Sequence, residues 1–521
     1  MKLMDVIRKR VLKFLGLENL SENPYSERLT FIQDEQNIEL QKLREYKTWY
    51  LGSADELLNF YSNEELYGNA REPIYNRNRQ NYFWGLSSIE NSIKRVHSGI
   101  PHSIVFTLTN IIGDFMLQCG DEETQLKLER IIEDNDLRFK INQEEMPLTM
   151  VEGWGAFKIN FDKQLSDTPI IQFYEAMNCE FVYKSSCLIG IIYKDYYKYN
   201  GKNYVLIETR RKLNGDSLIE YELFRLEDGE EVKKVELSEI PELSGLQNVK
   251  IEGLNEVLGV PIKFFFDPYN KNYGRSIYAG KVDLFDDLDQ ILSQDSQTVR
   301  VSTPVEYYPV DLLERNKDGQ PRMPKVFNRQ YVAKESMPDG DGNTDGNIQT
   351  TQPDLNFDKY SEHAKAKLEM ILVGLMSSAS FGWDIAKKDN AEAQREKEKA
   401  TIYTRNNIID RQKNALEKLF SLTLMVQEYI ETGLITLKDY DIVISYDEFA
   451  NPSMESLIGV YEPAFVDGAI STKKYVELLW GDRLSDEEKT EEIAYLEEQR
   501  NKDNLDLSDF EDEKPSEFNR R

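Results

Sequence analysis

Two helical segments enclose a proline-rich stretch, and this arrangement constrains the fold more than any other feature of the sequence. Apolar residues recur at helical spacing over residues 274–299 and again over residues 357–375. The stretch between them, residues 300–356, contains prolines throughout, which is typical of irregular structure with two or three short strands. The sequence therefore predicts two helices that bracket a compact, loop-rich insertion.

The N-terminal half changes from helical to strand-like spacing near residue 150. Residues 35–66 and 88–118 have helical spacing, with Ser53 as the N-cap of a second helix in the first stretch and a break near Pro101 in the second. Between about 150 and 266 the apolar period is two, which predicts strands. Asn-Gly and Asp-Gly pairs favour hairpin turns, and they lie at Asn200-Gly201, Asn214-Gly215 and Asp228-Gly229. We expect an antiparallel meander that serves as a scaffold.

The C-terminal part of the chain is predicted to be helical again. A helix of roughly 60 Å is expected over residues 391–432, and Gly433 supplies its C-terminal stop. A strand over 440–446 and three short helices follow. Residues 503–513 contain six acids and no base, so we expect a disordered tail over residues 503–521. Helices and an antiparallel sheet together predict an α+β fold.

The charge and the cysteines exclude several classes of protein. Acidic residues number 93 and Lys plus Arg 64, which gives a formal charge of −29. This balance argues against a protein that gains affinity for DNA or RNA by neutralising phosphates, although it allows one that handles nucleic acid without holding it. Cys119, Cys179 and Cys187 form no CxxC pair, which excludes a disulfide scaffold and fits a reducing compartment. No apolar run reaches the roughly 20 residues that span a bilayer, so no membrane partner is expected.

Residues 3–15 combine helical apolar spacing with basic side chains. Arg8, Lys9, Arg10 and Lys13 interrupt the apolar residues, so the segment lacks the continuous apolar core of a signal peptide. It is a short basic amphipathic helix by pattern. We expect it to dock on the body of the protein, and the alternative is an arm that binds a membrane surface or a partner.

The motifs of catalysis and cofactor binding that we sought in the sequence are absent or incomplete. The three histidines, His97, His102 and His363, have no metal-ligand spacing. Residues 274–281 superficially resemble a P-loop, but five residues separate the two glycines and Val282 follows the lysine where Ser or Thr would bind Mg²⁺. We therefore expect no cofactor and no enzymatic activity.

One segment has part of the spacing of a calcium loop. Asp341, Asn343 and Asp345 follow the first positions of an EF-hand, but Gln352 stands at position twelve and cannot supply the bidentate carboxylate. A flexible Gly/Asn/Asp loop is the favoured interpretation, and calcium binding is a weak alternative.

The order of these parts resembles the portal proteins of tailed bacteriophages, in the family typical of long-tailed phages of Gram-positive hosts. The resemblance covers nearly the whole chain and rests on the order of several segments more than on any one of them. These segments are YKTWYLG with ELLNFYS, VPIKFFFDPYNKNYGRSIYAGKVDLFDDLDQILSQDSQTV, LMSSASFGWD before AEAQREKEKATIYTRN, and ISYDEFANPSMESL.

The resemblance implies a closed ring, typically of twelve subunits, at one vertex of the capsid. Such a ring is the channel for packaging and ejection of double-stranded DNA, which passes through it without sequence-specific binding. The implied partners are the terminase large subunit, the major capsid and scaffolding proteins, and the head–tail adaptor. The implied location is the virion, after assembly in the host cytoplasm.

The resemblance also divides the chain into named parts. They are the wing (1–273), first stem helix (274–299), clip (300–356), second stem helix (357–375), tunnel loop (376–390), long wing helix and strand (391–449), crown helices (450–502) and acidic tail (503–521).

Four acids on the first stem helix are candidate channel-lining residues: Asp283, Asp286, Asp287 and Asp289. The usual meaning of such a run is a solvated acidic face. Carboxylates repel phosphates within a Debye length of about 8 Å. We therefore expect part of this set to face the channel, where DNA would slide without a deep binding well.

The tunnel loop interrupts the helical pattern, and its glycines permit bending. Phe381 and Trp383 either project into the channel or pack into the wing, while Lys387 and Lys388 are placed to meet phosphate. The candidate residues of the loop are Ser377, Ser378, Ser380, Phe381, Gly382, Trp383, Lys387 and Lys388.

The sequence leaves two other functions open. A non-viral structural protein could oligomerise through the helix at 391–432, although Arg405, Asn406 and Asn407 interrupt any coiled-coil seam. A hydrolase is the least supported alternative, because no acid–base pair stands out among the many acids.

Overall fold

The computed structural model describes two compact units of the chain, which are treated separately below. The first unit lies within residues 1–387 and 397–447, and the second within 388–396 and 448–521. The described residues are 40–62, 82–85, 93–162, 165–226, 232–268, 270–302, 304–310, 313–320, 322, 330–335, 348–352, 356–382, 391–433, 440–446, 458, 461–463, 465, 470–480 and 488–498. The predicted helix over 3–15, the calcium-loop candidate and the acidic tail lie outside them.

The first unit begins with two helices that meet at a glycine. Residues 40–51 are helical, and α3 (Ala54–Ser62) follows. Gly52 has a φ of +68°, a conformation that favours glycine, and the Ser53 hydroxyl accepts a hydrogen bond from the Glu56 backbone N–H at 3.4 Å. The predicted N-cap at Ser53 is therefore confirmed.

The next segment differs from the helix predicted over residues 88–118. Pro101 lies in the first turn of α4 (Ile100–Ile112), where proline is tolerated, so it begins a helix and does not break one. Beyond Gly113, residues Phe115–Cys119 form strand β1, which pairs antiparallel with β14 (Ile442–Tyr446). The elements that follow are α5 (Glu122–Asp134), α6 (Leu137–Lys140), the π-helical η5 (Ile141–Glu145) and α7 (Met146–Glu152).

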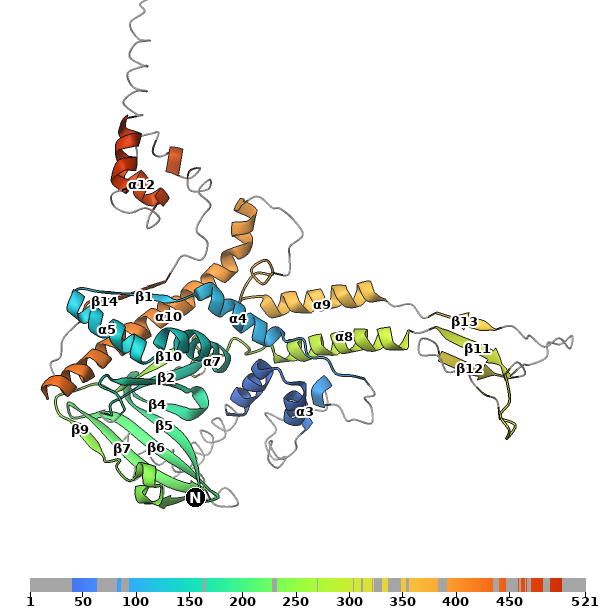
Figure 1. Cartoon of the computed structure of the whole chain (residues 1–521), viewed down its shortest axis with the longest axis horizontal. Coiled ribbons are helices and arrows are strands. Elements are labelled where there is room, and N and C mark those ends of the chain that lie inside the picture. Colours follow the sequence, from blue (N-terminus) through green and yellow to red (C-terminus); the bar gives the residue numbers. More distant parts are fainter. Residues whose placement is uncertain are drawn as a thin grey trace, which may run out of the picture. The chain divides into compact units, whose positions relative to one another are not determined.

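Two sheets form the strand-rich part of the first unit (Figure 1). One is antiparallel, in the order β10-β2-β3, with β2 at Trp154–Asn160, β3 at Ile170–Glu175 and β10 at Gly259–Lys263. The other is the predicted meander β4-β5-β6-β7-β8, and β9 also pairs with β7. Its strands are β4 (Cys179–Lys184), β5 (Cys187–Tyr199), β6 (Lys202–Leu213), β7 (Asp216–Leu226), β8 (Val232–Val235) and β9 (Val249–Ile251).

The hairpin turns of this meander follow the predicted chemistry. Asn200 and Gly201 have φ angles of 49° and 74°, and Asn214 and Gly215 have φ angles of 55° and 90°. Positive φ at both central residues is the signature of a type I′ turn, so these two turns are confirmed. The Asp228-Gly229 turn lies outside the described residues.

The two expected stem helices are α8 (Val282–Val301) and α9 (Phe357–Leu372), and both are shorter than predicted. Residues 274–281 are not helical: Gly274 forms a β-bridge with Phe266, and residues 277–281 form turns. Gly274 packs against the backbone of Gly153 so closely that a Cβ there would lie 2.1 Å from the Gly153 carbonyl oxygen. At the other end, Gly374 has a φ of +77° and ends α9 early.

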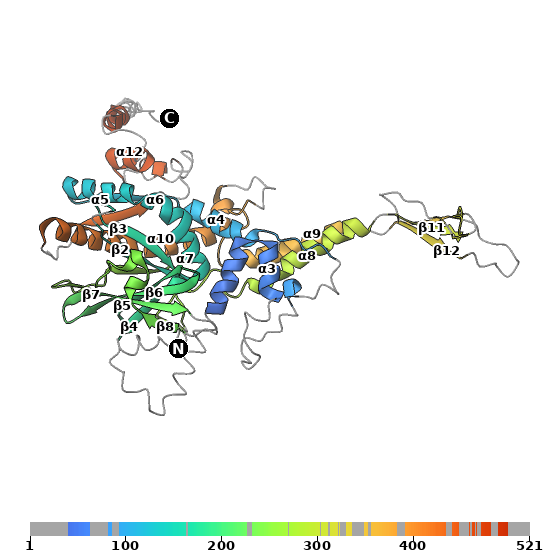
Figure 2. The ribbon, with the colours of Figure 1, turned by 60° about the horizontal axis from the view of Figure 1, so that its bottom comes forward.

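A small sheet lies between α8 and α9 in the chain. Its order is β12-β11-β13, with β11 at Val305–Pro309, β12 at Gln330–Lys334 and β13 at Gln349–Thr351. β12 runs parallel to β11, and β13 runs antiparallel to it. The short strands expected in the insertion are thus present (Figure 2).

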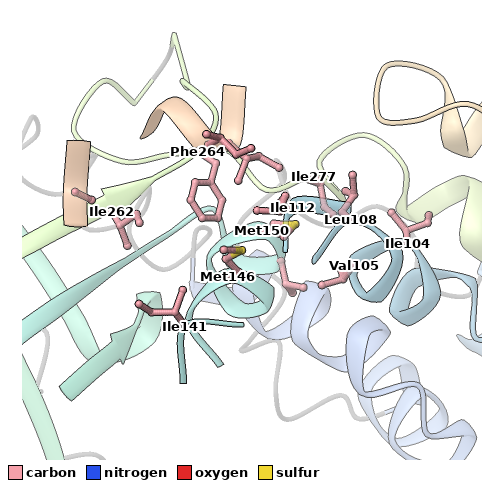
Figure 3. Packing of buried hydrophobic residues seen from close by; sticks show 14 of the residues in the cluster. Ile104, Val105, Leu108, Ile112, Ile141, Met146, Met150, Ile262, Phe264 and Ile277 are labelled. Carbon is pink, nitrogen blue, oxygen red and sulfur yellow. The ribbon is translucent and has the colours of Figure 1, made fainter. Parts of the chain in front are cut away.

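The long helix α10 (Ala391–Thr432) has the predicted bounds, and Gly433 follows it with a φ of +72°. The main apolar core of the first unit joins helices and strands that are distant in sequence, as Figure 3 shows. Its members there include Ile104, Val105, Leu108 and Ile112 of α4, Ile141 of η5, Met146 and Met150 of α7, Ile262 of β10, Phe264 and Ile277.

The second unit contains α12 (Thr472–Trp480) and further helical residues at 488–498. The Ser471 hydroxyl accepts a hydrogen bond from the Lys474 backbone N–H at 3.3 Å and so caps the N-terminus of α12. Phe465 stacks on Tyr475 with 4.2 Å between the ring centroids. Helices and mainly antiparallel sheets make the chain an α+β protein. Within the described residues, no helix combines the length and apolar character needed to cross a membrane.

Candidate functional site

Asp286 of α8 is buried and binds backbone groups from a distant segment. Its carboxylate accepts hydrogen bonds from the backbone N–H groups of Phe83 at 2.8 Å and Trp84 at 3.3 Å. Burial raises the pKa of Asp286 to about 7, although both backbone hydrogen bonds favour the charged form. Through these two hydrogen bonds the Asp286 carboxylate caps the short helical turn η4 (Phe83–Gly85).

Asp289, one turn further along α8, is also wholly buried. It accepts hydrogen bonds from the Trp84 indole N–H at 3.1 Å and from the Ser98 backbone N–H at 2.8 Å. The His97 Nδ1 lies 2.7 Å from the same carboxylate. Because a carboxylate only accepts, Nδ1 carries the hydrogen in this contact.

These contacts belong to one continuous stripe on α8. The Asp283 carboxylate accepts from the Tyr82 hydroxyl at 2.6 Å, and the Ser293 hydroxyl accepts from the Val96 backbone N–H at 2.8 Å. Positions 283, 286, 289 and 293 share a helix face. We call residues 82–85 and 93–98 the strap, because both lie along this stripe. The expected solvated acidic face is therefore wrong for Asp286 and Asp289, whose carboxylates hold the strap and are not available to line a channel.

Asp287 lies to the side of the stripe and joins α8 to α9. Its carboxylate forms an ion pair with Lys367 at 2.6 Å, and its side chain is 48% exposed. Two further contacts connect the helices: Lys281 Nζ donates to the Val373 carbonyl at 2.9 Å, and Thr298 Oγ1 lies 3.3 Å from the Tyr360 hydroxyl. Along these three contacts the residue numbers rise in α8 and fall in α9, so the two helices are antiparallel. The carboxylates of Asp283 and Asp287 are exposed. That these two residues face a channel stays a prediction.

The described half of the predicted tunnel loop is fixed to α10. Thr401 of α10 accepts a hydrogen bond from the Ser377 backbone N–H at 2.9 Å, and its hydroxyl lies 2.9 Å from that of Ser380. Phe381 packs against the main core, as the wing-packing alternative requires. Ser378 is partly exposed, and Gly382 has a φ of +80°. Trp383, Lys387 and Lys388 lie outside the described residues.

The calcium candidates Asp341, Asn343 and Asp345 also lie outside the described residues. Within the part of the chain that the structure describes, His, Cys, Asp and Glu side chains form no group of three or more that could hold a metal ion. His97 contacts the Asp289 carboxylate through its Nδ1. His102 stacks between Tyr50 and Phe106 at centroid distances of 5.0 and 6.4 Å.

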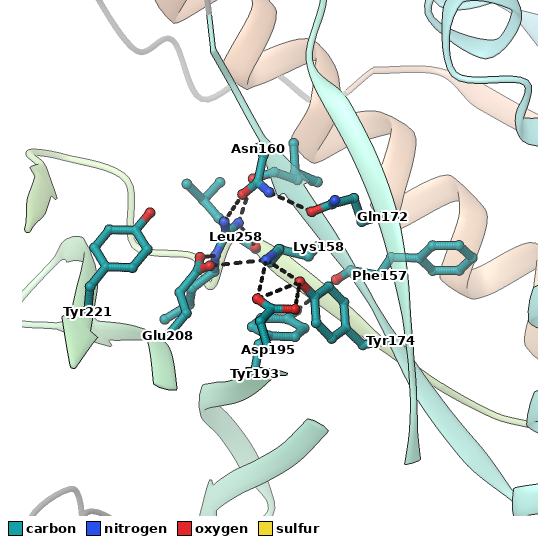
Figure 4. Close-up of polar contacts among 12 residues, drawn as sticks. Phe157, Lys158, Asn160, Gln172, Tyr174, Tyr193, Asp195, Glu208, Tyr221 and Leu258 are labelled. Atoms are coloured by element: carbon teal, nitrogen blue, oxygen red, sulfur yellow. Dashed lines mark hydrogen bonds and ion pairs between the residues drawn. The ribbon is translucent and has the colours of Figure 1, made fainter. Parts of the chain in front are cut away.

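A buried charge cluster between the two sheets was missed by the sequence analysis (Figure 4). Glu208 of β6 lies 3.1 Å from Lys158 Nζ of β2 and 2.6 Å from Arg210 Nε. Burial alone would raise the pKa of Glu208, but the Arg210 and Lys158 cations hold it below its usual range. Lys158 also contacts Tyr174 of β3 at 2.5 Å, and Tyr174 contacts Asp195 of β5 at 2.8 Å. Since each charge is engaged inside the cluster, the cluster joins the two sheets.

Charged residues in the middle of strands were the available signal for this cluster. Alternation places Glu208 and Arg210 on one side of β6, but the sequence analysis did not single them out. Which strand supplies the opposite charge depends on how the sheets pack, and a single sequence does not reveal that.

A further buried acid connects η5 to α10. Glu145 accepts hydrogen bonds from Gln412 Nε2 at 2.6 Å and from the Thr149 hydroxyl at 3.2 Å. Complete burial raises the pKa of Glu145 to about 8, so the folded chain favours the neutral acid at pH 7. This residue too was not singled out by the sequence.

The buried apolar residues of α10 pack within the first unit. Leu416, Leu419 and Phe420 are buried in the main core, and Arg405 donates to the carbonyls of Ile111 and Ile112 at the C-terminal end of α4. This packing does not favour a coiled coil through α10. Comparison of the chain with protein-family models and with curated proteins finds no match.

Proposed function

We propose that the chain is a subunit of the portal ring of a tailed bacteriophage, which conducts double-stranded DNA into and out of the capsid. The observation that carries the proposal is the antiparallel pair α8–α9, which is interrupted in the chain by the small sheet β11–β13 and followed by the long helix α10 (Figure 1). This order corresponds to stem, clip, stem and wing helix in the resemblance described above.

The exposure of the helix pair supports an assembly of several copies. Near the strap, Phe285 and Leu288 of α8 are buried, whereas at the other end Val299 and Phe357 are 56% and 61% exposed. The contact between Thr298 and Tyr360 places these two apolar side chains at the same end of the pair. A ring buries such residues in heterologous contacts that repeat from copy to copy.

The charge of the chain supports passage of DNA without retention. A formal charge of −29 per subunit repels phosphate at short range. Asp283 and Asp287 are the remaining candidates for the channel wall. In this proposal the sheet β11–β13 faces the terminase large subunit and later the head–tail adaptor, and the major capsid and scaffolding proteins surround the ring in the virion.

Imaging tests this proposal directly. The full chain, purified at micromolar concentration, is viewed by negative-stain electron microscopy and weighed by mass photometry. Rings with a central hole and a mass many times 60.8 kDa are expected. Phe357→Asp should shift the population toward smaller species, while Lys359→Asp, at another exposed position in the first turn of α9, should change it less. A strictly monomeric protein, or a rod without a hole, would contradict the proposal.

A further inference from the structure

Several cations gather at the end of strand β10, in a chain whose formal charge is −29. Lys263 is the last residue of β10, and the backbone then turns back through the β-bridge between Phe266 and Gly274. The Lys263 ammonium donates to the carbonyls of Lys271 and Asn272 at 3.1 and 3.4 Å, which holds it beside the tip of this hairpin. No other acceptor among the described residues contacts it, so one of its three N–H groups remains available.

Two arginines lie close to this lysine. The Arg275 backbone N–H donates to the Phe265 carbonyl at 3.0 Å, so Arg275 belongs to the same hairpin. Arg411 approaches from α10: burial and the nearby Arg411 guanidinium together hold the pKa of Lys263 below its ordinary value. The side chains of Lys271, Arg275 and Arg411 are exposed. We call Lys263, Lys271, Arg275 and Arg411 the basic site.

The charge of the basic site is not neutralised by the part of the chain that the structure describes. There, none of its four cations forms an ion pair with a carboxylate. Asp267 lies in the same hairpin, but it is half-buried and does not pair with them. Because like charges that lie close together repel each other, a bound anion would stabilise this arrangement.

Packing against the main core fixes the backbone that carries these cations. Ile262 and Phe264, on either side of Lys263, are buried in that core (Figure 3). On α10, Ile408 is wholly buried about one turn before Arg411. The cations therefore extend from a fixed hairpin and a fixed helix, and an anion that binds them has little backbone to order.

We propose that the basic site binds phosphate groups of double-stranded DNA on the surface of the first unit. The inference rests on the proposed function, in which DNA is the polyanion that the protein meets. A guanidinium binds a phosphate through two parallel N–H donors, and an ammonium binds it as a point charge. Four cations make a weak contact without sequence specificity, which agrees with a chain that handles DNA without holding it.

DNA binding by the full chain tests the proposal. A short fluorescein-labelled duplex is titrated with protein, and the dissociation constant is read from anisotropy at several salt concentrations. Neutralisation of four phosphates predicts that the affinity falls roughly a hundredfold between about 50 and 200 mM salt. At the lower salt concentration, Lys271→Glu with Arg411→Glu should weaken binding by roughly tenfold or more.

A matched double variant controls for net charge. Lys198→Glu with Lys202→Glu changes the formal charge by the same amount at exposed positions beside the β5–β6 turn, and it should weaken binding much less. Arg275→Ala repeats the measurement at an independent position of the basic site if the circular dichroism of the Lys271→Glu, Arg411→Glu protein departs from that of the parent.

Three outcomes would overturn the proposal. They are a parent chain that does not bind the duplex at low salt, an equal loss in both double variants, and displacement of the duplex by poly-glutamate as readily as by unlabelled DNA. The last result would assign the site to an acidic protein segment. Negative-stain images of the same samples separate this test from the proposed function, because rings that bind DNA equally well after Lys271→Glu with Arg411→Glu contradict the basic site alone, whereas monomers contradict the portal ring.

Discussion

His97 and Asp289 form a buried contact in which the imidazole Nδ1 lies 2.7 Å from the carboxylate, with side chains 7% and 0% exposed. The same carboxylate accepts hydrogen bonds from Trp84 and Ser98. One residue of α8 therefore holds both parts of the strap, which lie about two hundred positions earlier in the sequence. The strap connects the N-terminal helices to the helix pair on which the proposed function depends.

The contact leads to a prediction for Asp289→Asn. An amide offers one acceptor oxygen and one NH2 group, so at least one of the three donors loses its partner. We expect the free energy of unfolding to fall by about 1–3 kcal/mol in urea titration. Glu362→Gln on the exposed side of α9 makes the same chemical change and should cost little. An equal loss in both variants would mean that the strap contacts do not contribute to stability.

A second prediction concerns pH and Glu145. The pKa of this acid is about 8 in the folded chain, against an ordinary value of 4.5, so the folded state binds the proton more tightly than the unfolded state. The Glu145 contribution to stability is therefore fully present below pH 4.5 and is lost as pH rises toward 8. Glu145→Gln cannot ionise, and its stability relative to the parent should improve by a few kcal/mol between pH 5 and 8.5, given about 1.4 kcal/mol per pKa unit.

The free energy of unfolding is measured for the parent and for Glu145→Gln at each pH. The difference between the two values isolates the contribution of Glu145. Glu152 also has a pKa raised by burial to about 8, and it is present in both proteins. A difference that stays constant from pH 5 to 8.5 would show that Glu145 is charged in the folded chain over this range.

Local patterns predicted those elements whose signals lie within one segment. The helix Ala391–Thr432 has the expected bounds because its spacing is sustained and Gly433 takes the positive φ that ends it. The turns at Asn200-Gly201 and Asn214-Gly215 likewise depend only on their own residues. The small strands of the insertion were also expected, although their parallel and antiparallel pairing was not.

Features that depend on distant partners were not predicted. Asp286 and Asp289 look like a solvated run along α8, and only the folded chain brings Trp84 and His97 to them. In the same way, Phe115 belongs to a strand because it pairs with Tyr446, more than three hundred residues away. Helical spacing through Gly274 gave no sign that Gly153 packs against it. In each case the deciding contact joins segments whose proximity a single sequence does not reveal.

This glycine contact gives a third prediction. An added Cβ at residue 274 would lie 2.1 Å from the Gly153 carbonyl oxygen and 2.8 Å from Lys263 Cβ, so the backbone must move. We expect Gly274→Ala to lower the free energy of unfolding by about 1–3 kcal/mol. Gly245→Ala is the control, since nothing lies within 4 Å of its added Cβ. If calorimetry gave the two variants the same midpoint, the backbone around Gly274 would be more adaptable than the close packing indicates.

The last prediction concerns how the tunnel-loop segment is held. Thr401 is wholly buried, and its hydroxyl is the point on α10 to which the Ser377 backbone and the Ser380 hydroxyl bind. Valine has nearly the same shape but no hydroxyl, so Thr401→Val removes the contact of both groups with α10, and the Ser380 hydroxyl keeps only the Ser377 hydroxyl at 2.9 Å. A lost hydrogen bond of this kind costs about 1 kcal/mol or more, which corresponds to roughly tenfold more frequent local opening.

Hydrogen exchange measured by mass spectrometry should show this opening as faster exchange over residues 377–382, with α8 and α9 unchanged. Thr423→Val is a matched control on the same helix, because Thr423 is equally buried and its hydroxyl bonds the Leu419 carbonyl at 2.7 Å. If both variants exchange alike over 377–382, the hydroxyl of Thr401 does not hold the segment. If only Thr401→Val opens it, the Thr401 hydroxyl holds the segment on α10 and its loss releases the segment locally, which is the behaviour that the proposed function expects of this loop.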